Sequence, residues 1–240
     1  MADRGVLVCH DADVTQIIAH RGASAAEPEN TVPAFRRAVA MGVDGIELDV
    51  RRTADDRLVV HHDPRLADGR VIRHTRSTEL PDAIPELDAA LDACDGAFVN
   101  IEVKNDPGEP DFDPTDWVVH RTVALLERRG LDARWLVSSF RFETVARCRA
   151  VVPRLRTAWL VGYATADVIT LASTAGHVAI HPWVAELDES QVRSAHAAGL
   201  SVNTWTCDDP VRIGELIAWG VDGICTNVPD VALAARRRNV

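Results

Sequence analysis

The chain has 240 residues, of which 47% are hydrophobic and 26% are charged, so it can bury a large core. Its formal net charge is −10, and the only run of basic residues longer than a pair is Arg236, Arg237 and Arg238, which argues against a nucleic-acid or anionic-membrane surface. If the substrate is an anion, a divalent cation and a few placed basic side chains must supply positive charge locally.

The cysteines and the N-terminal sequence indicate in which cellular compartment the protein is located. Five cysteines, widely spaced and without a C-x-x-C pair, indicate neither a disulfide framework nor a zinc site. The N-terminus has no basic segment followed by a long apolar run, and eighteen apolar residues occur together nowhere. We therefore expect a cytoplasmic protein with reduced thiols and no stable membrane association.

From residue 16 onward, short β-branched or apolar runs alternate with longer helical patterns, as in repeated βα units with a parallel sheet. The expected strands cover 16–20, 44–50, 97–103, 134–138, 155–159, 177–181, 200–205 and 222–226. The expected helices include 31–42, 116–130, 141–152, 189–199 and 209–220. Eight such units predict an α/β fold, a (β/α)8 TIM barrel, with residues 1–240 forming a single domain.

One segment interrupts the alternation. Residues 57–62 have the pattern of a ninth strand, joined to the second by the turn-like residues 54–56. We expect a hairpin at the barrel rim, followed by a short irregular insertion to about residue 84. Residues 1–14 and the Arg-rich tail are expected to be peripheral.

Acidic side chains occur on two of the expected strands. Side chains two apart on a strand share a face, so Glu47 and Asp49 should point together into the barrel, and Glu102 and Lys104 should do the same on the third strand. Buried carboxylates need partners, and an oxygen-only set suits Ca²⁺ or Mg²⁺ better than Zn²⁺. The alternative is a structural ion network that Lys104 and nearby arginines neutralise.

Two histidines end expected strands. His20 closes the first strand and leads into Arg21, at the barrel end where enzymes of this fold place catalytic groups. His62 ends the hairpin strand, and because adjacent strand residues face opposite sides, only one of His61 and His62 can address the pocket. A histidine at a strand end is also a common structural residue, so these positions alone do not identify a reaction.

An ordered set of motifs resembles the glycerophosphodiester phosphodiesterase family. These motifs are HRG (20–22), PENT (28–31), GIELDVRRTADDRLVVHHD (45–63), NIEVK (100–104), SSF (138–140), NTWT (203–206) and GVDGICTNVPD (220–230). The resemblance implies a metal-dependent enzyme that hydrolyses glycerophosphodiesters, as small-molecule substrates, to glycerol phosphate and an alcohol.

The same resemblance implies roles for individual residues. Metal ligands would be Glu47, Asp49 and Glu102; the acid/base pair would be His20 and His62; the phosphate-binding cations would be Arg21 and Lys104. These roles match the chemistry, since phosphodiester cleavage needs neutralised phosphate oxygens, a base and an acid. Asp63 would be a partner of the histidines or a turn residue. Trp205 ends the seventh expected strand and is either a stacking surface for the substrate alcohol or a rim residue.

Two departures from the family pattern and three alternatives remain. Cys207 and Asn227 stand where family members often carry a small aliphatic residue and an aspartate. An amidohydrolase-like barrel is disfavoured because the first strand has His20 but no H-x-H. A phosphatidylinositol-phospholipase-like lyase would use the same two histidines and form a cyclic phosphate. A non-catalytic anion-binding barrel would have little use for two imidazoles beside three carboxylates.

Overall fold

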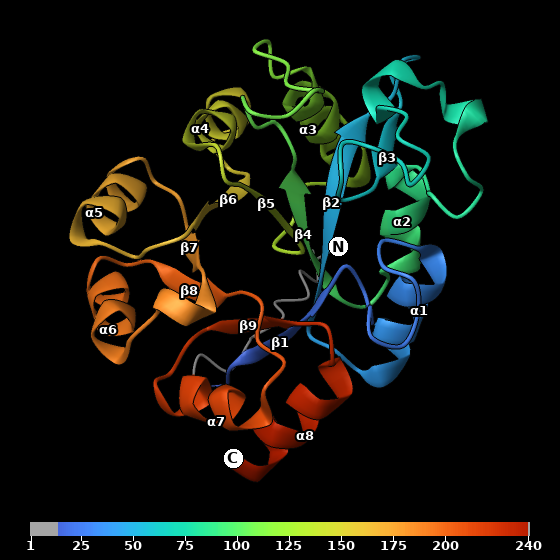
Figure 1. Cartoon of the computed structure of the whole chain (residues 1–240). Coiled ribbons are helices and arrows are strands. Elements are labelled where there is room, and N and C mark those ends of the chain that lie inside the picture. The colour runs from blue at the N-terminus through green and yellow to red at the C-terminus, as the bar shows by residue number, and fades with distance from the viewer. Residues whose placement is uncertain (1–13, 240) are drawn as a thin grey trace, which may run out of the picture.

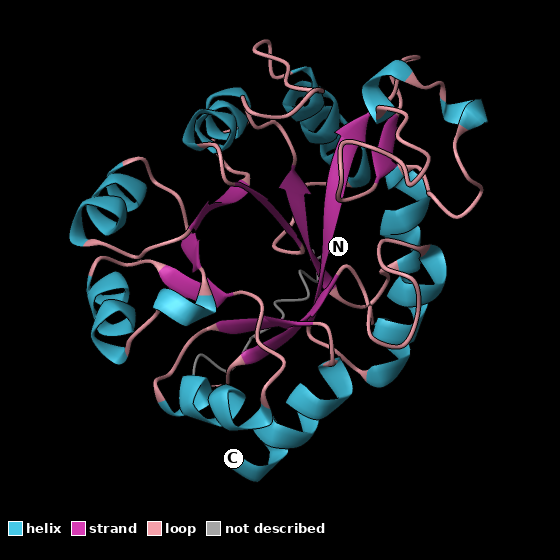
Figure 2. Ribbon diagram, viewed as in Figure 1, coloured by secondary structure: helices cyan, strands magenta, loops and turns pink. Residues whose placement is uncertain are grey.

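The computed structural model describes residues 14–239 and contains a ring of parallel strands surrounded by helices (Figures 1 and 2). The barrel strands are β1 (Gln16–His20), β2 (Gly45–Arg52), β4 (Phe98–Val103), β5 (Trp135–Ser139), β6 (Arg156–Val161), β7 (Ala179–Pro182), β8 (Ser201–Thr204) and β9 (Gly223–Thr226). Pairing of β1 with both β9 and β2 closes the ring. The predicted (β/α)8 barrel is confirmed.

Helices follow the strands and cover the outside of the barrel (Figure 2). They are α1 (Val32–Met41), α2 (Leu87–Ala93), α3 (Trp117–Arg129), α4 (Phe142–Val151), α5 (Ala166–Thr174), α6 (Glu189–Ala197), α7 (Pro210–Ala218) and α8 (Pro229–Asn239). No helix in residues 14–239 combines the length and the apolar character needed to cross a membrane.

Helix α1 illustrates how the local sequence sets the element boundaries. The Thr31 hydroxyl accepts a hydrogen bond from the backbone N–H of Ala34, and a proline occupies the first turn, where its missing N–H is harmless. At the other end Gly42 adopts φ 79°, a left-handed conformation that favours glycine. The tight N-terminal cap fixes the preceding Asn30, which contacts an acidic side chain inside the barrel.

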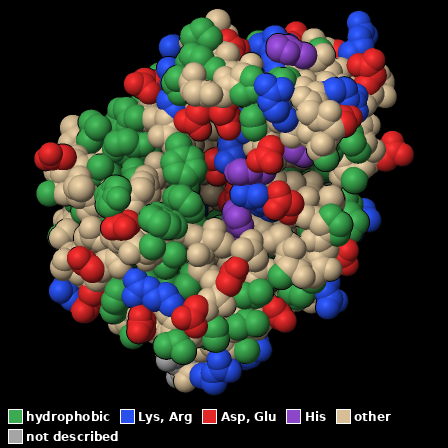
Figure 3. Space-filling model, viewed as in Figure 1, with side chains coloured by type: hydrophobic (Ala, Val, Ile, Leu, Met, Phe, Trp, Pro, Cys, Tyr) green, Lys and Arg blue, Asp and Glu red, His purple; other side chains and the backbone are tan. Residues whose placement is uncertain are grey.

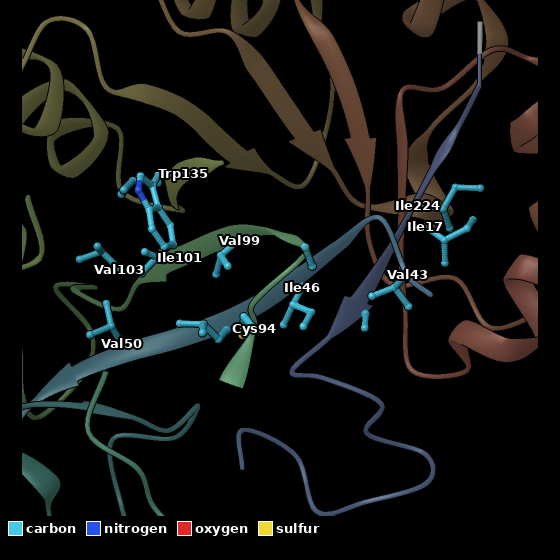
Figure 4. Close-up of a cluster of buried hydrophobic side chains, with 14 of the residues drawn as sticks. Ile17, Val43, Ile46, Val50, Cys94, Val99, Ile101, Val103, Trp135 and Ile224 are labelled. Atoms are coloured by element: carbon cyan, nitrogen blue, oxygen red, sulfur yellow. The ribbon is translucent and has the colours of Figure 1, made fainter. Parts of the chain in front are cut away.

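The main hydrophobic core lies between the strands and the helices (Figure 4). Alternate strand residues such as Ile46, Val99 and Ile101 are completely buried in it. A second cluster, formed by Leu136, Ala158 and Ala179, comes from the opposite strand faces. Because one set of alternate residues meets the helices, the other set is left to fill the lumen and to carry the polar side chains.

The hairpin expected after the second strand is present. Strand β3 (Leu58–Val60) pairs antiparallel with the end of β2, with Val60 opposite Val50. The insertion that follows contains two short 3-10 helices, η1 (Ile72–His74) and η2 (Ser77–Glu79). It has a small core of its own, in which Val59 packs with residues of the insertion.

The expectation that the Arg-rich tail is peripheral holds for Arg237 and Arg238, which are exposed, but not for Arg236. The tail ends α8, where Ala232 and Leu233 are buried. Arg236 donates to the backbone oxygen of Thr15 at 3.0 Å and pairs with the carboxylate of Asp44, which ties the helix to the start of β1. The residues before the arginines therefore belong to a helix that packs against β1. Of the expected peripheral N-terminus, residues 1–13 lie outside the described residues.

Candidate active site

One pocket of about 500 Å³ opens at the ends of the barrel strands. In Figure 3 histidine, basic and acidic side chains gather at the central hollow of the visible face. The residues that line it are Ile18, His20, Arg21, Glu47, His62, Asn100, Glu102, Lys104, Phe140, Leu160, His181, Asn203, Trp205 and Cys225. The pocket therefore contains most of the side chains singled out in the sequence.

The strand register brings three carboxylates together. Asp49 of β2 lies directly opposite Glu102 of β4, and Glu47 points the same way two residues earlier. One oxygen from each of the three lies within 4.8 Å of the others, and all three side chains are buried. The Glu47 Oε1 atom is buried without a hydrogen-bond partner among the described residues. An unpaired carboxylate oxygen in such a cluster suits a divalent cation.

Two basic side chains offset part of this negative charge. Lys104 Nζ lies 2.5 Å from Glu102 Oε1 and 3.2 Å from Asp49 Oδ1. Arg21 Nε lies 3.4 Å from Asp49 Oδ2, and the backbone N–H of Arg21 donates to Glu47 at 3.0 Å. The ion network considered from the sequence is thus present. However, two cations balance only two of three carboxylates, so ionisation of all three would leave an excess negative charge.

The excess charge is reflected in the pKa values. Burial, together with the Asp49 charge, raises the pKa of Glu47 to about 8, and burial likewise raises the pKa of Glu102 to about 8. Burial also opposes ionisation of Asp49, but the charges of Lys104, His62 and Arg21 lower its pKa to about 2. Without a further cation, the neutral form of two of the acids is favoured near neutral pH.

The two histidines are held in the same manner. His20 Nδ1 lies 2.7 Å from the Asn227 side-chain oxygen, and His62 Nδ1 lies 2.7 Å from an Asp63 carboxylate oxygen. Each ring therefore keeps Nε2 available, and that of His20 lies 4.0 Å from Glu47. Burial is the largest cause that lowers the pKa of each imidazole below its usual 6.5, so the neutral forms are favoured.

His61 faces a different part of the molecule. Its Nδ1 bonds to the backbone oxygen of Asp63 at 2.8 Å, and it lines a separate groove that also includes Pro28 and Ile84. Only His62 of the pair lines the central pocket. The expectation that only one of the pair addresses the pocket agrees with this arrangement, and the family resemblance, not strand alternation, had assigned His62.

Three further residues support the site and were not among the sequence candidates. Asn30, named only as part of the PENT motif, donates from Nδ2 to Asp49 at 2.8 Å. Asn227 was noted only as a family departure. Its side-chain oxygen lies 2.7 Å from His20 Nδ1, and its Nδ2 donates to Asp208 at 2.7 Å. The signals were present in the PENT and TNVPD segments, but their meaning depends on contacts between distant strands.

Arg51 is the third. Its side chain is 1% exposed, and it donates from Nε to the backbone oxygen of His62 at 2.8 Å. It also pairs with Glu109 at 2.8 Å and with Asp111 at 2.7 Å. Arg51 thus connects strand β2, the backbone of His62 and the loop between β4 and α3.

The opposite side of the pocket is largely apolar, with His181 and Asn203 as its polar residues. Phe140, Leu160 and Trp205 line it, and the Phe140 and Trp205 rings meet edge to face with centroids 5.3 Å apart. The Trp205 indole N–H donates to the backbone oxygen of His181 at 2.7 Å. Trp205 is therefore a pocket wall that offers carbon surface, with its one polar atom already paired.

Known proteins resemble this chain over most of its length. A profile of the "Glycerophosphoryl diester phosphodiesterase family" matches residues 20–231. A glycerophosphodiester phosphodiesterase of Bacillus altitudinis is 31% identical over 254 residues, covering 93% of this chain and 98% of that protein. One of Caldanaerobacter subterraneus subsp. tengcongensis is 28% identical over 248 residues, covering 93% and 98%.

A solved structure gives the same result. The phosphodiesterase of Oleispira antarctica in complex with the product sn-glycerol-3-phosphate has a TM-score of 0.85 at 26% identity, and the match covers 92% of this chain and 96% of that one. The resemblance carried by the motifs is confirmed, and this chain belongs to the glycerophosphoryl diester phosphodiesterase family.

Proposed function

We propose that this enzyme hydrolyses a glycerophosphodiester to glycerol phosphate and an alcohol, with a divalent cation and two histidines. The observation that carries the proposal is the carboxylate cluster, whose oxygens lie within 4.8 Å of one another beside His20 and His62. Family membership and the product complex of the Oleispira antarctica relative support the same reaction.

Glu47, Asp49 and Glu102 would hold the cation. Their donor atoms are all carboxylate oxygens, a hard ligand set that favours Mg²⁺ or Ca²⁺. The unpaired Glu47 Oε1 and the uncompensated charge of the cluster support this assignment. The bound cation would neutralise the non-bridging phosphate oxygens and polarise the phosphorus.

The protein side chains supply the remaining steps. Arg21 and Lys104 sit beside the acids and would bind the phosphate oxygens. One histidine would take a proton from water as its oxygen bonds to phosphorus, and the other would give a proton to the alcohol oxygen as its bond to phosphorus breaks. Trp205 would contact the departing alcohol. Because each Nδ1 is already bonded, both histidines would act through Nε2.

Product analysis tests the reaction. Incubation with glycerophosphocholine in ¹⁸O-labelled water, with Mg²⁺ or Ca²⁺, should give glycerol phosphate that carries one labelled oxygen, as read by ³¹P NMR and mass spectrometry. A cyclic phosphate as the end product would replace the hydrolase assignment with the lyase alternative. Failure to cleave glycerophosphocholine or bis(p-nitrophenyl) phosphate under any metal condition would refute the proposed activity.

We also propose a cytoplasmic location. Cys94, Cys148, Cys207 and Cys225 are free and buried, and free thiols are typical of a reducing compartment. Localisation of a tagged full-length chain in its native cell tests this proposal, and recovery from outside the cytoplasm would contradict it.

A further inference from the structure

The pocket is divided into two chemically different halves. The charged side chains come from β1, β2, β4 and the hairpin, whereas the side of β5 to β8 contributes three apolar side chains and two buried polar ones, His181 and Asn203. In Figure 3 hydrophobic side chains border the hollow on the side of β5 to β8, and basic, acidic and histidine side chains border it on the other. The phosphate and the cation belong to the charged half, which leaves the apolar half for another part of the substrate.

We call four side chains the apolar wall: Phe140, Leu160 and Trp205, which line the pocket, and Trp183, which does not line it but pairs with Trp205. Phe140 follows β5 directly, Leu160 lies near the end of β6, and the two tryptophans follow β7 and β8 directly. Trp183 and Trp205 are partners in a parallel bridge, so their side chains share a face. The wall therefore extends from the pocket outward over the rim.

The wall keeps aromatic surface exposed to solvent. Phe140 is 37% exposed and Trp183 is 42% exposed, although large hydrophobic side chains with this exposure are few in the described residues. Adjacent exposed aromatic residues at the mouth of a pocket are typical of ligand contact rather than of random surface positions. The wall also offers few polar atoms, because the Trp205 indole N–H is already bonded to His181.

The glycerol group does not fit this wall. Glycerol carries hydroxyls that need hydrogen-bond partners, and burying them against carbon surface would be unfavourable. Two buried amides of the pocket, Asn100 on the charged half and Asn203 on β8, each have a side-chain oxygen without a hydrogen-bond partner among the described residues. The glycerol hydroxyls can find an acceptor there, so the wall is left for the second alcohol of the diester.

A quaternary ammonium alcohol is also disfavoured. An aromatic cage would have to offer ring faces to the cation. Here Lys104 Nζ already lies 5.9 Å from the centroid of the Phe140 ring. The Phe140 and Trp205 rings pack edge to face, so they do not offer two open ring faces to a cation. A second cation at this place would be repelled by Lys104.

Resting on the proposed function, we propose that the preferred substrate is a glycerophosphodiester whose second alcohol is apolar, an alkyl group long enough to lie on Phe140, Leu160, Trp183 and Trp205. Each fully buried methylene favours binding roughly fourfold. The wall is partly exposed, so half of this free energy over four added methylenes corresponds to about fifteenfold.

Matched esters provide the test. Glycerophosphoethanol and glycerophosphohexanol have leaving alcohols of nearly equal acidity, so they differ in contact area rather than in intrinsic reactivity. We expect kcat/KM to be about fifteenfold higher for the hexyl ester, and Trp183→Ser to reduce the ratio to below about threefold by lowering the hexyl rate more than the ethyl rate. The matched control is Leu171→Ser, an exposed apolar residue on α5, which should leave the ratio unchanged.

The outcomes are distinguishable. Equal rates for the two esters, or a ratio that Trp183→Ser does not change, would overturn this inference while leaving phosphodiester hydrolysis in place. A glycerophosphocholine rate above the hexyl rate, and lost in Trp183→Ser, would assign the wall to a cation instead. No cleavage of any ester would refute the proposed function itself. Hydrolysis of the ethyl ester by Trp183→Ser shows that the variant is folded.

An apolar second alcohol could belong to a soluble diester or to a lipid. A second arm compares the hexyl ester as a monomer with a long-chain ester of the same head group in phosphatidylcholine vesicles. Trp183-dependent cleavage of the monomer supports a soluble source, and cleavage confined to the vesicle ester supports a lipid source. Binding of vesicles that carry no ester, with no effect on either rate, would contradict a substrate role for the wall.

Discussion

At the residue scale, protonation of the carboxylate cluster couples metal binding to pH. The pKa of Glu47 and that of Glu102 are raised to about 8, whereas metal ligands must be ionised. Both acids lose their protons as pH rises toward 8, so we expect affinity for Mg²⁺ or Ca²⁺ to increase between pH 6 and 8 and protons to be released on binding. Calorimetry in two buffers of different ionisation enthalpy measures both, and a pH-independent affinity would contradict the protonation states.

One substitution isolates the charge of the cluster. Glu47→Gln removes an anionic ligand at nearly constant volume, so we expect at least about tenfold weaker metal binding with an unchanged circular dichroism spectrum. Glu86→Gln is the matched control, because Glu86 pairs with Arg57 on the surface and lies outside the cluster. Full wild-type activity in excess chelator, with metal absence confirmed by elemental analysis, would exclude a metal requirement.

The two histidines should have separable roles. Loss of general acid or base catalysis costs on the order of 10² to 10⁴ in rate, so His20→Ala and His62→Ala should each fall in that range. The base is inactivated as pH falls through its pKa, and the acid as pH rises through its own. Burial lowers both pKa values, so at saturating metal the bell-shaped profile of kcat/KM should have its maximum near or below the usual imidazole pKa.

A substrate with a p-nitrophenolate leaving group distinguishes the two roles. It needs little protonation, so it should rescue the variant that lacks the acid but not the one that lacks the base. His61→Ala is the control, since His61 lines a separate groove. Near wild-type rates for both histidine variants on an unactivated diester would rule out the two-histidine mechanism.

The carboxylates could be placed in the barrel from sequence because strand alternation alone decides which side chains share a face. The contacts that hold the catalytic side chains in place could not be predicted from the sequence. His20 and Asn227 are 207 residues apart, and only closure of the ring brings them to 2.7 Å. Trp183 is a similar case, since its role follows from its pairing with Trp205 on the neighbouring strand.

At the element scale, the buried ion cluster of Arg51 joins three segments that short-range patterns treat as independent. The sequence predicted the hairpin of β2 and β3, because a turn-like triplet separates two apolar runs. It did not predict that the loop before α3 folds back to place Glu109 and Asp111 on Arg51. Such a contact has no local periodicity, so it is visible only in three dimensions.

Removal of this arginine should therefore be costly. Arg51→Leu leaves Asp111, which is 6% exposed, without its cation, and we expect a loss of about 3 kcal/mol or more in the free energy of unfolding. Arg57→Leu is the matched control: Arg57 and its partner Glu86 are both exposed, so that pair contributes less than about 1 kcal/mol. Urea denaturation measures both, and equal losses would show that burial of Arg51 is not decisive.

At the scale of the whole molecule, the barrel depends on closure at β1. This strand pairs with β2 on one side and β9 on the other, and α8 packs over it and against α1 and α7. His20 comes from β1, and its partner Asn227 directly follows β9. Closure of the ring and assembly of the active site therefore occur at the same seam, so loss of one should remove the other.

Leu233 on α8 tests this dependence, because it is a buried side chain of the helix that packs against β1. Leu233→Ala should lower the free energy of unfolding by about 2 to 4 kcal/mol, through lost burial and the cavity left behind. Arg238→Ala, on the exposed part of the same helix, should stay within about 0.5 kcal/mol of wild type. Because a closed barrel has no free edge at which to open gradually, the loss of circular dichroism and the loss of metal binding should coincide in urea. Separate transitions would show that the seam can open while the rest of the barrel stays folded, and the carboxylates on β2 and β4 would then retain the metal without the β1 histidine.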